Sequence, residues 1–127
     1  VFPTPGSVEW HLGATWLSER TGGRYAANED LLADLQAGRP EAEAEWARMV
    51  RALAVAVAGI VNAFDSERVI IGGGLAQSGD ALFGPLAQEL DAVAWRPNGL
   101  TVPVVPARLG RHAGSIGAAL FGRERSA

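Results

Sequence analysis

Cysteine and lysine are both absent from this chain of 127 residues. The lack of cysteine excludes disulfides, thiol nucleophiles and thiolate metal ligands. The lack of lysine excludes a Walker A phosphate loop and Schiff-base chemistry, since each depends on a lysine side chain. All eleven basic residues are arginine.

Basic charge and long apolar runs are also scarce. The net charge is −3, which provides no basic surface for nucleic acid, so we expect no nucleic-acid partner for this segment. The longest uncharged apolar run, 52–63, is too short to cross a bilayer, and no secretory signal opens the chain. We therefore expect a cytoplasmic protein with no membrane partner. The chain begins with Val1 rather than methionine, so we expect a fragment or a processed chain.

Helix patterns dominate the first half of the sequence. Apolar spacing predicts a helix over 8–20, interrupted by Gly13, that ends at Thr21-Gly22-Gly23, and a second over 28–35 capped by Asn28. The clearest pattern is the third, over 40–64. Pro40 suits its first turn, and apolar residues then recur every three or four positions to Phe64.

The second half predicts a β-α-β unit followed by a helix. Short strands are expected at 68–71 and 100–105, with Pro103 favouring an edge position or an early end. Between them a helix capped by Ser78 or Asp80 should reach Val93, and a last helix should run from about 110–113 to 121. The fold class is therefore α/β, helix-rich with a small partly parallel sheet. Two strands make a poor sheet, so we expect it to continue into strands outside this chain.

Three consecutive glycines, Gly72 to Gly74, follow the first predicted strand. Bare backbone at this position could cradle a phosphate, lie flat against a nucleoside, or simply allow a tight turn. The spacing is not that of the G-x-G-x-x-G fingerprint, which argues against a dinucleotide site. From the glycines alone, the nucleoside and structural interpretations stay open.

Two longer segments carry a resemblance to a known family. They are NAFDSERVIIGGGLA (62–76) and TVPVVPARLGRHAGSIGAAL (101–120), with Ser66 in place of a frequent proline. Together they resemble the C-terminal part of the ROK family, which groups bacterial sugar kinases with sugar-responsive repressors. The resemblance implies that 1–127 form the C-terminal lobe of an actin-like ATPase (RNase H-like) sugar kinase fold.

The resemblance also implies a role for the glycine turn. Gly72, Gly73, Gly74 and Leu75 would bind the adenosine of ATP, which the intact protein would use with Mg²⁺. No catalytic residue is expected in this chain, because the family's phosphate hairpin and catalytic aspartate would precede Val1. The sugar would bind through the missing lobe, and the protein would be a homodimer or a higher homo-oligomer.

The resemblance bears on metal binding as well. Gly6-Ser7-Val8-Glu9 lines up with the end of the family's zinc loop, but serine stands where a thiolate would be. Only His11 and His112 remain as nitrogen ligands, so no zinc or other metal site is expected.

Other residues have a structural interpretation that we prefer. Tryptophans 10, 16 and 46 are expected in the core or at a subunit contact, and Arg108 and Arg111 at the surface rather than on a phosphate. The acidic residues Asp30, Asp34, Glu41, Glu43 and Glu45 are expected on solvated helix faces.

Three functions therefore compete. The chain could be part of a glucokinase-like sugar kinase, inactive on its own, or the sugar-sensing domain of a ROK repressor without kinase activity. It could also be a structural oligomerisation module in which the glycines only turn the chain.

Overall fold

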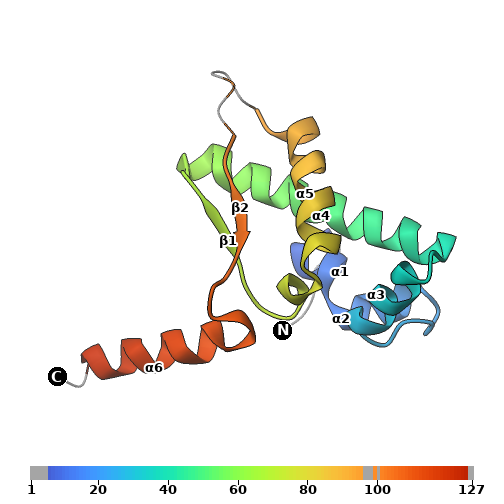
Figure 1. Cartoon of the computed structure of the whole chain (residues 1–127), viewed down its shortest axis with the longest axis horizontal. Helices are drawn as coiled ribbons and strands as arrows, with labels where there is room; N and C mark the ends of the chain where they lie inside the picture. The colour runs from blue at the N-terminus through green and yellow to red at the C-terminus, as the bar shows by residue number, and fades with distance from the viewer. Residues whose placement is uncertain (1–5, 96–98, 100, 126–127) are drawn as a thin grey trace.

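A computed structural model of the chain describes residues 6–95, 99 and 101–125. The described part contains six α-helices, two short strands and two 3₁₀ turns (Figure 1). The expected turn at 96–99 and the start of the second expected strand at Leu100 lie largely outside these residues.

Helix α4 (Pro40–Phe64) is the centre of the core, as its sequence pattern predicts. Its first residue is Pro40, whose missing N–H is unused at this position. The helix ends at Asp65, which adopts the left-handed conformation with φ of 49°. Its buried residues come from most of its length: Ala42, Trp46, Met49, Val50, Leu53, Ala54, Val57 and Ala58.

The first expected helix is two helices in the structure, α1 (Val8–Leu12) and α2 (Ala14–Arg20). Gly13 separates them and has an extended backbone. Its N–H donates to the Glu9 carbonyl at 2.8 Å, the last hydrogen bond of α1. A Cβ on Gly13 would lie 2.8 Å from the backbone carbonyl oxygen of Glu9, so a side chain would fit here only if the backbone shifted. The sequence predicts an interruption at Gly13, and the structure shows that this interruption divides the segment into two helices.

Helix α3 (Asn28–Gln36) begins where the sequence predicts, but Asn28 is not its cap. The Asp30 carboxylate instead accepts from the N–H groups of Ala26 and Ala27, at 3.2 and 3.1 Å. A carboxylate in the first turn also interacts favourably with the helix dipole. Asn28 uses its side-chain amide to donate to the Leu12 carbonyl at 3.5 Å, which links α3 to α1.

Helix α5 (Asp80–Val93) packs along α4 and completes the core with Leu82, Leu86 and Leu90. Its N-cap is Gly79, and neither Ser78 nor Asp80 makes the expected side-chain cap. Gly79 has φ of 56°, a conformation in which a residue with a side chain would be strained.

The sheet consists of β1 (Val69–Ile71) and β2 (Val104–Pro106), which pair in parallel. Val69 lies opposite Val104 and Ile71 opposite Pro106, which confirms the small parallel sheet. Val69, Ile71 and Val104 pack against the core, whereas Ile70 is 64% exposed on the other face. Continuation of the sheet into further strands stays a prediction.

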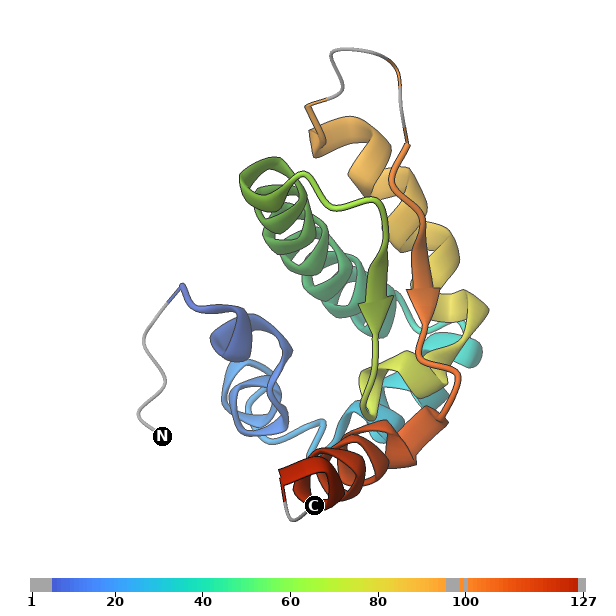
Figure 2. The ribbon, with the colours of Figure 1, turned by 90° about the vertical axis from the view of Figure 1, so that its left-hand side faces the viewer.

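The chain ends in η2 (Gly110–His112) and α6 (Ala113–Arg125). Figure 1 shows α6 leading away from the other helices, below the sheet. In the view of Figure 2, α1–α2 are seen on one side of the two strands and α6 below them.

Helix α4 is also long and apolar enough to cross a membrane by length and composition. Because it packs against α1, α3 and α5 and supplies most of the core, it has the character of the central helix of a globular domain.

Candidate functional site: the glycine turn at the sheet edge

The candidate site is the turn by which β1 leads into η1 (Leu75–Ser78). Gly72, Gly73 and Gly74 are all exposed, while Leu75 is half-buried and packs against the core. The next residue, Ala76, is buried, so the carboxyl-terminal end of the turn is held against the core. The backbone of the turn is therefore held in place while its outer face is open.

The local backbone requires a glycine at only one of the three positions. Gly73 has φ of +84°, which side chains rarely tolerate, whereas Gly74 is in the right-handed helical region with φ of −61°. A Cβ on Gly74 would meet no atom within 4 Å, and one on Gly72 would make an ordinary contact with Ala107 at 3.5 Å. The backbone conformation therefore explains Gly73, but neither conformation nor packing within this chain explains Gly72 or Gly74.

The second wall of the site comes from the end of β2. Because the strands are parallel, both of their carboxyl ends lie at one edge, the usual position of ligands in α/β sheets. The Ala107 N–H donates to the Ile71 carbonyl at 2.8 Å, and this hydrogen bond links the segments that follow β1 and β2. Beyond it, η2 packs against η1, and Gln77 Nε2 would lie 3.8 Å from a Cβ on Gly110.

The chemistry of this edge suits binding better than catalysis. Arg108 is exposed beside η2, and the side chain of Arg111 lies outside the described residues. Asp80, the first acidic residue after the turn, is exposed at the start of α5. The arrangement offers exposed backbone groups with open space beside them, and we assign no catalytic residue to it.

Asp34 and Glu45, two of the acidic residues expected on solvated faces, are partly buried and held by hydrogen bonds. Asp34 accepts from the Tyr25 hydroxyl at 3.1 Å and from Arg39 Nε at 2.9 Å. Glu45 is clamped between Arg20 and Arg48, with ion pairs of 2.8 Å to each and only 14% of its side chain exposed. Burial alone would raise the pKa of Glu45, but the hydrogen bonds and charges of the two arginines lower it.

The same arginines hold the end of α1. Arg20 and Arg48 donate to the His11 carbonyl at 3.1 and 3.4 Å, and Arg48 Nη1 lies 2.8 Å from His11 Nδ1. Because a guanidinium only donates, Nδ1 of His11 is the acceptor in this pair. At the other end of α1, the Ser7 hydroxyl accepts from the Trp10 N–H at 3.1 Å and caps the helix.

These contacts bear on the question of zinc. Serine at position 7 acts as a helix cap, and the Nδ1 of His11 is occupied by Arg48. Within the described residues, histidines and carboxylates form no group of three that could hold a metal ion.

The three tryptophans considered in the sequence analysis differ in burial. Trp46 is 4% exposed in the core, as expected. Trp10 and Trp16 are half-buried and pack on each other, with ring centroids 3.8 Å apart.

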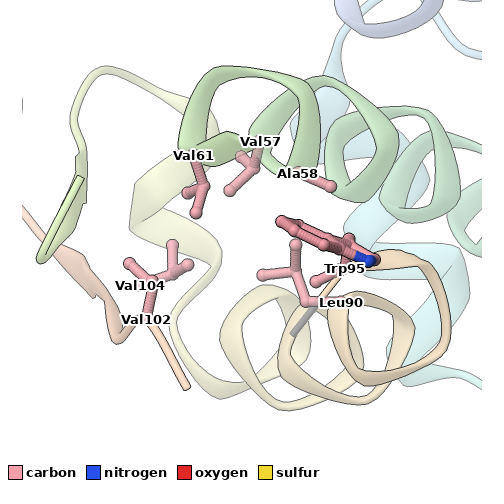
Figure 3. Close-up of a pocket in the computed structure, with 8 residues that line it drawn as sticks. Val57, Ala58, Val61, Leu90, Trp95, Val102 and Val104 are labelled. Atoms are coloured by element: carbon pink, nitrogen blue, oxygen red, sulfur yellow. The ribbon is translucent and has the colours of Figure 1, made fainter. Parts of the chain in front are cut away.

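A separate cavity lies between α4, α5 and the segment that leads to β2 (Figure 3). It measures about 30 Å³ and is lined only by apolar side chains, including Val57, Val61, Leu90 and Trp95. Because it is this small and its lining contains no charged or hydroxyl side chain, it has the character of a packing void rather than a sugar or nucleotide site.

The sequence pattern that defines the ROK family matches residues 14–125. The chain belongs to the ROK family. The curated relatives include the glucokinase of Thermotoga maritima, 44% identical over 78 residues, which are 61% of this chain and 25% of the relative. The glucokinase of Streptomyces coelicolor is 33% identical over 91 residues, 68% of this chain and 28% of the relative.

Solved ROK structures have a similar fold. The ROK hexokinase of Thermus thermophilus has a TM-score of 0.68 and 29% identity, over 91% of this chain and 40% of that one. A ROK glucokinase from Streptomyces griseus, solved with glucose and AMPPNP, has a TM-score of 0.66 at 22% identity, over 92% and 41%. The chain therefore spans about a quarter of the length of the curated relatives and two fifths of the solved ones.

Proposed function

We propose that this chain is the C-terminal lobe of a ROK-type, ATP-dependent sugar kinase of the actin-like superfamily. In this proposal Gly72–Leu75 form the surface on which the adenosine of ATP lies. The other lobe would supply the sugar site, the phosphate and Mg²⁺ contacts and the catalytic base. The intact enzyme would be a cytoplasmic homodimer or higher homo-oligomer, with no nucleic-acid or membrane partner through this segment.

The observation that carries the proposal is the unexplained absence of side chains at Gly72 and Gly74. Both positions have ordinary backbone conformations and room for a Cβ, yet both are glycine at the exposed carboxyl edge of a parallel sheet. A ligand that approaches the backbone closely would account for this, since any side chain would occupy its place. The purely structural interpretation accounts for Gly73 alone.

The relatives favour a kinase over a repressor. Those described above are named as glucokinases and a hexokinase, and one of them was solved with glucose and the ATP analogue AMPPNP. Transfer of a phosphoryl group from ATP to a sugar is therefore the reaction we propose for the intact protein. Closure of two lobes over the reactants would exclude water from that reaction.

The test is nucleotide binding by the chain itself. Because this chain would supply only the adenosine part of the site, it should bind AMPPNP weakly, in the millimolar range. Gly74→Val should abolish this binding, because its methyl groups would occupy the space in which the adenosine lies. Gly84→Val is the matched control, because Gly84 on α5 is also exposed and open around its Cβ position but lies away from the turn. Unchanged binding by Gly74→Val, or equal losses in both variants, would contradict the proposal.

A further inference from the structure

The side chain of Gln77 lies where the glycine turn meets the segment that follows β2. Its backbone N–H donates to the Gly74 carbonyl at 3.0 Å, so Gln77 is one 3₁₀ turn beyond the glycines. Its Nε2 atom would lie 3.8 Å from a Cβ on Gly110, so the amide extends from η1 toward η2. Because η1 and η2 are in contact at one edge of the sheet, this amide lies next to the surface on which we place the adenosine.

The amide of Gln77 is available to a ligand. Gln77 is exposed, and its side chain has no hydrogen-bond partner among the described residues. The other polar side chains close to the turn differ in chemistry: Ser78 has a single hydroxyl group, and Asp80 and Arg108 are charged. Of these four side chains, only the glutamine presents a neutral donor and an acceptor side by side.

An adenine ring presents a matching pair of groups along one edge. Its N6 amino group donates and its N7 accepts, and a glutamine amide can bond to both at once. Guanine has two acceptors, O6 and N7, at the same edge, so the amide oxygen would face another acceptor. In protein–DNA complexes a bidentate pair of this kind discriminates between bases by about fivefold or more.

We infer that Gln77 selects adenine over guanine at the glycine turn. Its amide oxygen accepts from the N6 amino group of the base, and its amide nitrogen donates to N7. The inference rests on the proposed function, because it requires the adenosine to lie on the turn. Arg108 could not make this choice, since a guanidinium only donates and would favour the two acceptors of guanine.

The first test needs no variant. The 127-residue chain is titrated with ATP, GTP and 7-deaza-ATP, which keeps the amino group but has a C–H in place of N7, and binding is followed by amide chemical shifts. We expect ATP to bind at least about fivefold more tightly than GTP. We expect it to bind at least about threefold more tightly than 7-deaza-ATP, because only one of the two hydrogen bonds is lost.

The second test removes the amide. In Gln77→Ala the three nucleotides should bind with affinities that agree within about twofold, because the remaining contacts to the turn do not depend on the edge of the base. Gln88→Ala is the matched control, since Gln88 is also an exposed glutamine but lies in the second half of α5. This control should keep both preferences of the wild type. Thermal unfolding of both variants shows that each is folded.

The outcomes separate this inference from the proposed function. Binding at 72–77 with equal affinity for ATP and 7-deaza-ATP, or with an ATP preference that Gln77→Ala keeps, overturns the role of Gln77 alone. Equal losses of preference in Gln77→Ala and Gln88→Ala overturn it as well. No nucleotide binding, or shifts centred on the groove between α1 and α4 that Val8 and Val55 line, overturns the proposed function and the inference together.

Discussion

The indole of Trp46 donates a hydrogen bond to the carbonyl of Ala81 at 2.8 Å. Ala81 lies four residues before Pro85, which has no N–H to donate back to it within α5. The tryptophan on α4 therefore replaces the missing helical hydrogen bond of α5, and the two main core helices are joined at this point.

Replacing this tryptophan should separate its hydrogen bond from its bulk. Trp46→Phe leaves the Ala81 carbonyl without either partner and should lower the free energy of unfolding by about 1–3 kcal/mol. Trp95→Phe is the control, since Trp95 is 73% exposed and should change stability by less than about 0.5 kcal/mol. Urea unfolding checks both, and equal effects would show that the Trp46 contact is unimportant.

The glycine turn should respond differently at neighbouring positions. Gly73→Ala forces a side chain into a φ of +84° and should cost about 1–2 kcal/mol. Gly74→Ala, in a helical conformation with open space, should be neutral or stabilise by up to about 1 kcal/mol because it restricts the unfolded chain. Urea unfolding of both variants checks this, and a large cost at Gly74 would indicate that the fold itself needs that glycine.

Acid should weaken the clamp around Glu45. Because the folded pKa of Glu45 is lowered, its contribution to stability is present above the unfolded pKa of about 4.3 and is lost as the pH falls through the folded value. Glu45→Gln should cost about 1–3 kcal/mol at pH 7, and the difference from wild type should shrink below about pH 4. The control is the exposed Glu43→Gln, measured by urea unfolding over the same pH range. A constant difference would contradict the assigned pKa direction.

The apolar cavity should accept one more methylene group. Val61→Ile adds that group next to a void of about 30 Å³ and should stabilise the fold by up to about 0.8 kcal/mol. Val55→Ile, on the exposed face of the same helix, should be close to neutral. Thermal unfolding of both variants tests this, and destabilisation by Val61→Ile would show that the cavity cannot admit the group.

Local sequence patterns predicted the elements well and their ends less well. Helix α4 has a period and a first-turn proline that hold over 25 residues, so its bounds were confirmed. The interruption at Gly13 is visible in the sequence, but the cap of α3 depends on a choice between Asn28 and Asp30 that local chemistry leaves open.

Contacts between distant residues were missed for a different reason. Arg48 lies one turn from Glu45 on the same helix, but Glu45 was expected to be solvated because its second partner, Arg20 on α2, reaches it only in the folded chain. The glycine turn was found early because three adjacent glycines after a β-branched run are visible in the sequence. Their open outer face is visible only in the structure.

The measurement that tests the central claim most directly is mapping of amide chemical shifts in the 127-residue chain during titration with AMPPNP. The account predicts that the largest changes fall on the amides of 72–77, at the exit of β1, and that they vanish in Gly74→Val. Changes confined to other surfaces, such as the groove at Val8 and Val55, or none at saturating nucleotide, would contradict it.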